Sequence, residues 1–405
     1  MSRAPVAAAN AGSSAQPRHK ATAVRMKNAA SPVSKPDHAR SQCSVLCSDE
    51  SVEDSQIVQG TSASPTAPKT NAIQRGAIGS LGRKPVRTLW QMRNKTTRIG
   101  VVGGTGAVGT VTLGLLREHG FENVRVFASA RSAGKQVAGW TVEEATPEAL
   151  ARGDIDVFLF SVGTSASREL VPHAVAGGAI AIDKSSAYRL EPGIPLVVPE
   201  VNGGRALEHE GIIANPNCCT IPLTCILKPL HDEAGLVRVR VATYQSVSGA
   251  GAQSMERLRN ESPDEHDLRM DWDFDGEEFD EESKLRAETQ KIMELPELPI
   301  QATCVRVPVM VGHAEAVWIE TENELTAERA RELLAGAPSV RIEEFPSPGK
   351  AAGIDDVLVG RIRRDPTVEQ GLALFIASDN LRKGAALNAI QIAELLLDPA
   401  RAAAA

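Results

Sequence analysis

Short apolar runs alternate with helical patterns over the middle of the chain. The helical stretches repeat apolar residues on one face, as around Leu113 and Leu116. An alternation of strands and helices favours an α/β fold with a doubly wound parallel sheet. The predicted strands of this sheet are 98–102, 124–128, 155–162, 179–183, 196–198 and 211–214.

Beyond this sheet the apolar runs become longer and indicate a second, largely antiparallel sheet in an α+β domain. Its predicted strands are 237–247, 302–311, 316–320, 357–363 and 372–377. A final apolar helix at 379–397 is expected to return to the first domain. The predicted organisation is an extension at 1–95, a first domain at 96–218 completed by 379–400, and a second domain at 219–378.

The first ninety-five residues show no sustained periodicity and are rich in Ala, Ser, Pro and Thr. Such a composition buries too little surface to offset the entropy of ordering, so this extension is expected to be disordered. It is basic and almost free of acid up to Cys47, which resembles an organelle transit peptide followed by a linker. The alternative is a plain low-complexity tail.

Composition excludes several classes of protein. The net charge of −7 is segregated, and no basic patch is interleaved with aromatics, so nucleic acid is not an expected partner. Eighteen consecutive apolar residues occur nowhere, so no membrane-spanning helix is predicted. The six cysteines lack a disulfide framework, and Cys43 with Cys47 lacks the second pair that a zinc site needs. We therefore expect no metal.

A glycine-rich turn follows the first strand and precedes a helix. Gly104, Gly106 and Gly109 match the dinucleotide fingerprint in its required context, so the first sheet is predicted to be of Rossmann type. Backbone amides and the helix dipole can then bind a pyrophosphate. The expected contacts in this loop are Gly104, Thr105, Gly106, Ala107, Val108 and Gly109.

The end of the second strand indicates which dinucleotide is bound. An acidic residue there would bind a ribose 2′-hydroxyl, whereas this chain has Arg131 and Ser132, which suit a 2′-phosphate and favour NADP over NAD. The alternative is an ordinary solvated basic turn. Gly163 follows the third strand at its carboxyl end, where ligands bind in such sheets.

The stretch from Asn215 to Pro222 is predicted to turn sharply from a strand into a helix. Asn217 can cap that helix, which places Cys218 at its N-terminus, where free amides and the helix dipole favour a thiolate. Cys218 is therefore a candidate nucleophile. The alternative, a small buried core thiol, stays open on this stretch alone.

Three further polar residues lie near predicted strand ends, and each has an ordinary explanation when taken alone. His313 could be a hydrogen-bonded turn histidine, Arg306 an ion-pair partner, and Gln245 carries no signal of its own. Their combination with Cys218 is specific.

From about residue 98 to residue 397 the chain resembles the aspartate-β-semialdehyde dehydrogenase family. The resemblance rests on segments in family order, at 102–109, 129–135, 195–202, 216–218, 244–251, 302–309, 359–363 and 378–386. It implies NADPH-dependent reductive dephosphorylation of L-aspartyl 4-phosphate to the 4-semialdehyde, in the biosynthesis of lysine, threonine, methionine and isoleucine. It also implies a homodimer, and with the N-terminal extension it suggests a plastid enzyme.

The resemblance assigns roles to single residues. Cys218 forms a thioester, His313 shuttles protons and Gln245 orients the substrate. Arg306 binds the α-carboxylate, Glu288 the α-ammonium, and Lys284 and Arg189 the phosphate. Ser248, Gly249 and Asn380 resemble contacts near the nicotinamide. The first domain is then NADP-binding, and the second binds substrate and dimerises.

Three departures from the family pattern stand out. Cys219 occupies a position where serine is usual, and Lys184 follows Asp183 where asparagine is expected. The interval from Gly251 to Glu288 is short, and its acidic run at 261–282 is predicted to be a loop or disordered.

Two alternative functions remain. An N-acetyl-γ-glutamyl-phosphate reductase would share the architecture, but its nucleophile usually lies in a Gly-Cys-Tyr context, which is absent here. A catalytically impaired homologue acting as a binding protein is the other, although a scaffold needs neither Cys218 nor His313.

Overall fold

A computed structural model describes residues 95–260 and 272–398 of the chain. The predicted transit peptide, its linker and the Cys43–Cys47 pair lie outside the described residues, as does the first part of the acidic run. None of the helices in the two described ranges is both long enough and apolar enough to cross a membrane.

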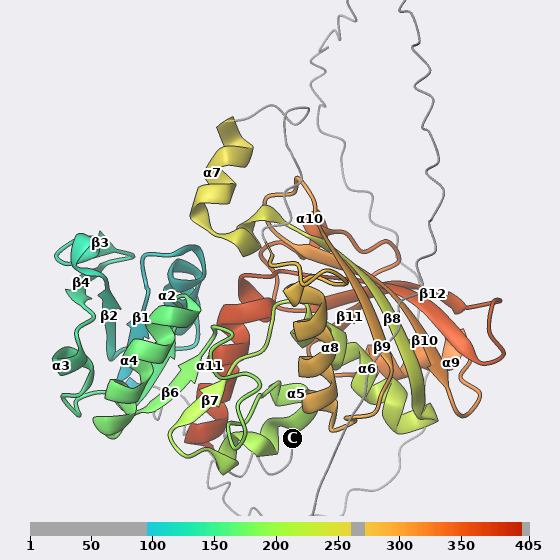
Figure 1. Ribbon diagram of the computed structural model, residues 1–405, viewed down its shortest axis with the longest axis horizontal. Helices are drawn as coiled ribbons and strands as arrows, with labels where there is room; N and C mark the ends of the chain where they lie inside the picture. Colours follow the sequence, from blue (N-terminus) through green and yellow to red (C-terminus); the bar gives the residue numbers. More distant parts are fainter. Residues whose placement is uncertain (1–94, 261–271, 399–405) are drawn as a thin grey trace, which may run out of the picture. The chain divides into compact units, whose positions relative to one another are not determined.

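The first sheet has seven strands, and its parallel part has the Rossmann order predicted from the sequence (Figure 1). The order is β3-β4-β2-β1-β5-β6-β7, in which β3 alone pairs antiparallel, with β4. The strands are β1 Ile99–Val102, β2 Val124–Ala128, β3 Gln136–Val137, β4 Trp140–Glu144, β5 Val157–Phe160, β6 Ile180–Asp183 and β7 Ile212–Ala214.

Helices cover both faces of this sheet because alternate strand residues point to opposite sides. Val157 and Leu159 of β5 belong to a core shared with α2 and α11, whereas Phe158 and Phe160 join a core shared with α4. The helices of this part are α2 Ala107–Glu118, α3 Pro147–Leu150, α4 Thr164–Ala176, α5 Pro199–Asn202 and α11 Leu387–Leu397, with 3-10 turns η1 Ala130–Ser132 and η2 Gly203–Glu208.

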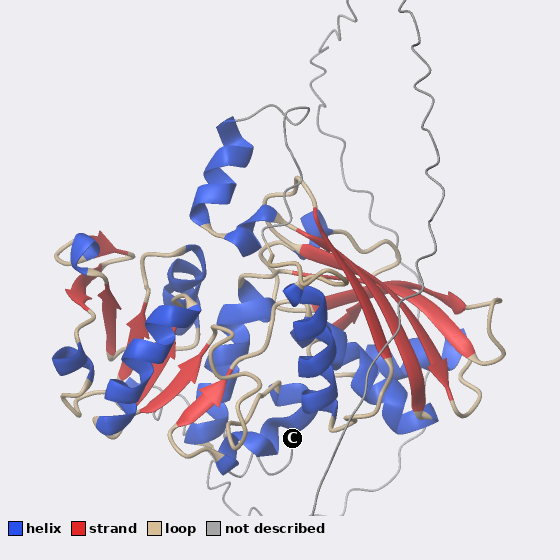
Figure 2. Ribbon diagram, viewed as in Figure 1, coloured by secondary structure: helices blue, strands red, loops and turns tan. Residues whose placement is uncertain are grey.

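The second sheet has six strands in the order β11-β12-β13-β10-β8-β9 (Figure 2). They are β8 Leu236–Gln245, β9 Ile300–Arg306, β10 His313–Thr321, β11 Val340–Ile342, β12 Val357–Arg364 and β13 Gly371–Ser378. Three of the five pairings are antiparallel, and β8 with β9 and β11 with β12 are parallel, so the sheet is mixed with the antiparallel majority that the sequence predicted. The β8–β9 pair is parallel because α8 lies between its strands in the sequence.

Helices pack on one face of the second sheet. These helices are α6 Thr220–Ala234, α8 Asp280–Met293 and α9 Ala327–Gly336. The short α10 Pro348–Ala351 packs on the other face through Ala351, Ala314 and Leu358, and α7 Ala252–Asn260 packs on the 3-10 turn η3 Val247–Ala250. Val239 and Val241 of β8 point into the core beneath α6, α8 and α9, whereas Arg238 and Tyr244 on the same strand are exposed. The predicted fold class, a Rossmann-type parallel sheet with a second α+β domain, is confirmed, and the second domain matches a dimerisation domain.

Several predicted elements differ in detail. Residues 196–198 form a single parallel bridge between Leu196 and Ala214 rather than a strand. The acidic run ends in α8, whose first turn contains Asp280, Glu281 and Glu282, because acidic side chains are favourable at a helix N-terminus. The predicted last helix begins as a π-helix, η5 Arg382–Ala386, before α11.

Candidate active site

The glycine-rich loop between β1 and α2 is built for close backbone approach. Gly103 has a φ of +85°, and a Cβ on it would lie 2.4 Å from the carbonyl oxygen of Ser161. A Cβ on Gly109 would lie 2.2 Å from the Gly103 oxygen, so α2 packs directly on the loop. Gly106 is the N-cap residue of α2 and has no side chain to accept a hydrogen bond from the helix. The first backbone amides of α2 can therefore donate to a ligand. These features fit a dinucleotide pyrophosphate.

The other predicted cofactor residues lie at strand ends on the same edge of the sheet. Gly163 caps α4 just after β5, which is the strand next to β1 at the point where the strand order reverses. Arg131 and Ser132 form η1 after β2, and the Arg131 side chain is exposed. This placement suits the adenosine end of a dinucleotide.

Cys218 lies in the turn between β7 and α6. The helix starts at Thr220, so Asn217 is not its cap residue as the sequence predicted. Instead the Asn217 Oδ1 atom accepts a hydrogen bond of 2.8 Å from the Cys219 amide, which fixes the turn. A Cβ on Gly384 of η5 would lie 3.1 Å from the Cys218 Cβ, so the π-helix packs directly against the nucleophile.

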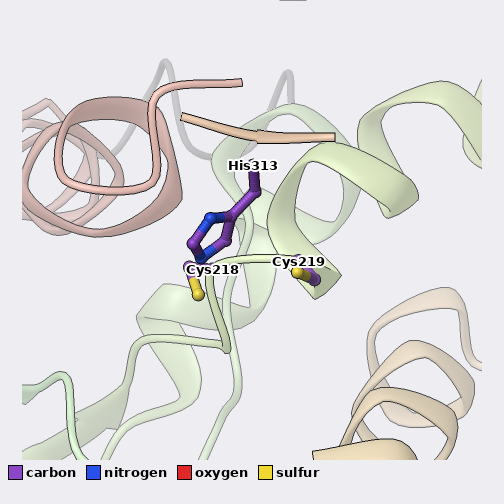
Figure 3. A group of neighbouring side chains, drawn as sticks. All are labelled: Cys218, Cys219 and His313. Carbon is purple, nitrogen blue, oxygen red and sulfur yellow. The ribbon is translucent and has the colours of Figure 1, made fainter. Parts of the chain in front are cut away.

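His313 faces Cys218 from the start of β10 (Figure 3). The Sγ atoms of Cys218 and Cys219 and a ring nitrogen of His313 all lie within 4.8 Å of one another. The Ser246 amide donates a hydrogen bond of 2.9 Å to Nδ1 of His313. An amide can only donate, so Nδ1 is an acceptor and the proton of the neutral ring is on Nε2. That nitrogen is buried and has no hydrogen-bond partner among the described residues.

The two adjacent thiols have opposite acidities. A hydrogen bond from Cys219 holds the pKa of Cys218 well below its usual value, with a smaller contribution from His313 and Arg189. Burial raises the pKa of Cys219, which therefore stays a thiol. These opposite shifts favour the thiolate at Cys218 and the thiol at Cys219.

Gln245 and Glu281 lie on the other side of the thiols. The Gln245 Nε2 atom donates to Cys219 Sγ at 2.8 Å and to Glu281 Oε1 at 3.0 Å, and Asn217 Nδ2 donates to the same carboxylate oxygen at 2.9 Å. Burial raises the pKa of Glu281, and the negative charge of Cys218 raises it further. Glu281 was not among the predicted site residues, although it lies three positions before Lys284 on the same helix face.

Arg306 ends β9 with its guanidinium turned into the site. Its Nη1 atom donates to the Ser246 carbonyl at 3.0 Å, and its Cζ atom lies 4.7 Å from the centre of the Trp272 ring. Trp272 is held by Phe279, with ring centres 6.1 Å apart. No sequence signal singled out Trp272, which is one of three aromatic residues in the acidic run.

Arg189 and Glu288 bind each other. The Arg189 Nη1 atom donates to Glu288 Oε1 at 3.0 Å, and the Asn217 amide donates to Glu288 Oε2 at 2.7 Å. Glu288 is completely buried and lines a cavity of about 280 Å³ beside Arg189 and Lys284. Lys284 pairs with Asp280 at the start of α8.

The predicted nicotinamide contacts form one hydrogen-bonded group. Asn380 Nδ2 donates to Ser248 Oγ at 2.8 Å, and the Gly312 amide donates to Asn380 Oδ1 at 2.9 Å. A Cβ on Gly249 would lie 3.0 Å from Arg306 Nη1 and 3.3 Å from His313 Nε2, so a side chain there would crowd the site.

A cavity of about 430 Å³ collects most of these groups. Its lining includes the predicted residues Val108, Arg189, Cys218, Gln245, Ser248, Gly249, Lys284, Arg306 and Asn380, together with Lys184, Trp272 and Glu281. Glu288 does not line it. A larger cavity of about 870 Å³, beside Arg205 and Glu294, contains none of the predicted residues.

The fold and site together define a dinucleotide-binding protein with a candidate nucleophilic cysteine in the turn between β7 and α6. Two family descriptions match it: "Semialdehyde dehydrogenase, NAD binding domain" at residues 98–209, and "Semialdehyde dehydrogenase, dimerisation domain" at 227–273 and 271–383. The second match is interrupted within the interval that the sequence predicts to be shortened.

Known relatives specify the family. The chain is 45% identical over 333 residues to the aspartate-semialdehyde dehydrogenase of Streptomyces akiyoshiensis, covering 74% of this chain and 98% of that protein. Identity to the Bacillus subtilis enzyme of the same name is 41% over 337 residues, covering 74% and 96%. This chain therefore belongs to the aspartate-semialdehyde dehydrogenase family.

Solved structures agree. Aspartate semialdehyde dehydrogenase II from Vibrio cholerae, complexed with ASA, has a TM-score of 0.71 and 38% identity over 75% of this chain and 98% of that chain. Aspartate semialdehyde dehydrogenase with NADP from Candida albicans has a TM-score of 0.60 and 27% identity over 74% and 98%.

Proposed function

We propose that this chain reduces L-aspartyl 4-phosphate to L-aspartate 4-semialdehyde with NADPH, releasing phosphate, as a step in amino-acid biosynthesis. The observation that carries the proposal is a cavity lined by Cys218, Gln245 and Val108 of the dinucleotide loop, with a ring nitrogen of His313 within 4.8 Å of the Cys218 Sγ atom. The lowered pKa of Cys218 favours its thiolate there.

The chemistry follows from the positions of these groups. The Cys218 thiolate forms a bond to the acyl carbon, and phosphate leaves with the electron pair of the broken carbon–oxygen bond, which gives a thioester. NADPH, when bound, supplies hydride to this carbon. His313 donates its Nε2 proton to the oxygen that becomes negative and takes it back as the carbonyl re-forms and Cys218 leaves as thiolate.

The substrate's charged groups have matching partners. Arg306 can bind the α-carboxylate through a two-point contact, which Lys could not reproduce. Glu281, rather than the predicted Glu288, takes the α-ammonium in this proposal, since Glu281 lines the cavity beside Gln245. Lys284, Arg189 and Ser186 line the same cavity as Cys218 and suit the phosphate.

NADP is proposed as the cofactor rather than NAD. The exposed guanidinium of Arg131 after β2 supports this choice because a 2′-phosphate needs a cation at that strand end. No acidic residue stands between Ser129 and Lys135 to bind a 2′-hydroxyl instead.

A homodimer is proposed from the second sheet. Tyr244 and Arg238 on β8, and Gln301 and Thr303 on β9, are exposed on the face opposite the core. A second copy of this face would cover them. Ala242→Arg, in the middle of the same face, should convert a dimer into a monomer in light scattering.

Import into a plastid is proposed from the basic, acid-poor sequence up to Cys47, which lies outside the described residues. A fusion of residues 1–95 to a fluorescent protein tests this. Cytosolic fluorescence would contradict it.

The activity is tested with the full chain by phosphate-dependent NADP reduction in the presence of aspartate semialdehyde. Cys218→Ala should abolish the reaction, and His313→Gln should lower kcat by roughly 10²–10⁴-fold. Turnover of N-acetyl-γ-glutamyl semialdehyde instead would favour the neighbouring reductase. A folded wild type that binds NADP without turnover would indicate a binding protein.

A further inference from the structure

Lys184 has an unusual position for a charged side chain. It follows β6, and its Nζ atom donates to Ser161 Oγ at 2.7 Å and to Thr112 Oγ1 at 3.3 Å. The neighbouring Asp183 carboxylate is used by the hydroxyls of Ser167 and Ser185, at 2.6 and 2.5 Å. No carboxylate within residues 95–260 and 272–398 forms an ion pair with Lys184. Two hydroxyls are therefore its bonding partners.

An ammonium at this position has two hydroxyl partners but no anionic hydrogen-bond partner among the described residues. Burial lowers the pKa of Lys184 to about 7, and Asp183 offsets this only in part. A buried charge is stable when it is paired, so the site favours an anionic ligand at the open side of Nζ. Lys184 lines the 430 Å³ cavity, which gives such a ligand access.

The partners of Lys184 identify which anion this is. Ser161 contacts the glycine-rich loop, since a Cβ on Gly103 would lie 2.4 Å from the Ser161 oxygen. Thr112 belongs to α2, the helix whose N-terminus is prepared for a pyrophosphate. Arg189 and Lys284, assigned to the substrate phosphate, line both the 430 Å³ cavity and the 280 Å³ cavity, whereas Lys184 lines only the first and is the residue that contacts Ser161 and Thr112.

We infer that Lys184 is a cofactor-binding residue whose ammonium binds the pyrophosphate of the dinucleotide from beneath the glycine-rich loop. The inference rests on the proposed use of NADPH. Lys184 places a cation where the family pattern has a neutral amide. The affinity of this chain for the cofactor should therefore be higher and should depend more strongly on pH.

The test compares binding of two ligands to full-length wild type, Lys184→Met and Lys184→Asn. NADPH is titrated by its own fluorescence, and 2′-AMP, which lacks the pyrophosphate, by competition. Loss of a hydrogen bond to a charged group should raise the Kd for NADPH by roughly tenfold or more and leave that for 2′-AMP unchanged. Unchanged NADPH binding, or equal loss for both ligands, would overturn the inference.

A pH series gives a second readout. The groups near Nζ are Asp183 on its own strand, the Arg189 guanidinium, which donates to the Lys184 carbonyl at 2.7 Å, and Cys218 in the same cavity. Thr112 and Ser161, from the elements packed against it, do not titrate. NADPH affinity of the wild type should fall as pH rises from 6 to about 9. In Lys184→Met, NADPH affinity should no longer change with pH in this way. The same pH series with 2′-AMP corrects for protonation of the ribose phosphate itself.

Two further outcomes separate neighbouring hypotheses. A wild type that fails to bind NADPH would contradict the proposed cofactor rather than the role of Lys184. An increase in the KM for inorganic phosphate in Lys184→Met, with NADPH binding intact, would assign the ammonium to the substrate phosphate and overturn the inference.

Discussion

The side-chain amide of Gln245 donates its hydrogen bond to Cys219 and not to the nucleophile beside it, at 2.8 Å from Nε2 to Sγ. Cys219 thus accepts a hydrogen bond from Gln245 and lowers the pKa of Cys218. The second thiol is a positioning residue for the first.

Replacement of Cys219 tests this arrangement. Cys219→Ala removes the donor, so the pKa of Cys218 should rise, and alkylation by iodoacetamide should require higher pH than in the wild type. Cys219→Ser retains a hydroxyl donor and should titrate close to the wild type. Equal pH profiles for the Ala variant and the wild type would show that Cys219 has no influence on the thiolate.

Glu281 and Glu288 allow a matched comparison on one helix. Glu281→Gln should raise the KM for aspartate semialdehyde roughly tenfold or more, because an ammonium loses its charged partner, while thermal stability changes little. Glu288→Gln should instead destabilise the protein, by about 3–5 kcal/mol at most, since Arg189 loses its buried partner. Steady-state kinetics and thermal unfolding distinguish the two residues, and the reverse pattern would restore Glu288 as the substrate ligand.

The difference between these two glutamates shows where sequence reasoning ends. Positions 281, 284 and 288 share one helix face, so spacing cannot say which acid reaches the substrate. The position of α8 relative to the turn that carries Cys218 determines which of the two glutamates reaches the substrate. The glycine loop and Cys218, by contrast, were predictable because local backbone requirements specify them. The strand β4 was missed because Thr141, Glu143 and Glu144 interrupt the alternation of apolar and polar residues that predicts a strand. The strand β11 was missed because an edge strand of three residues is too short to show such an alternation.

Trp272 should support substrate binding through Arg306. Trp272→Leu removes the ring that lies 4.7 Å from the guanidinium, and a contact of this kind is worth about 1–2 kcal/mol when partly desolvated. The expected result is a rise in the KM for aspartate semialdehyde of roughly 5- to 30-fold with a smaller change in kcat. Trp272→Phe should recover part of the loss. The control is Trp140→Leu, which removes a similar contact with Arg117 at 4.6 Å far from the catalytic groups.

His119 makes stability depend on pH near neutrality. A hydrogen bond of 2.6 Å to Glu394 raises the pKa of His119, and burial offsets part of that rise. The folded pKa is therefore above the unfolded value of about 6.5. The stabilisation is complete below that value and is lost as pH rises through the folded pKa. The wild type should lose more Tm than His119→Gln between pH 6 and pH 8.5, and parallel curves would contradict this.

The pair formed by Lys383 and Glu200 connects the π-helix to the first domain. Lys383 is completely buried, and its Nζ atom lies 2.7 Å from both Glu200 oxygens and from Gln391 Oε1. Burial alone would raise the pKa of Glu200, but Lys383 outweighs it and holds that pKa below its usual value.

Lys383→Met should lower the free energy of unfolding by about 3–5 kcal/mol because it removes the charged partner of a buried carboxylate, whereas Lys383→Met with Glu200→Gln should recover much of this. Denaturant unfolding of the four proteins measures the coupling. Additive losses would show that the two side chains act independently, and unchanged Cys218 alkylation in the double variant would confine their role to stability.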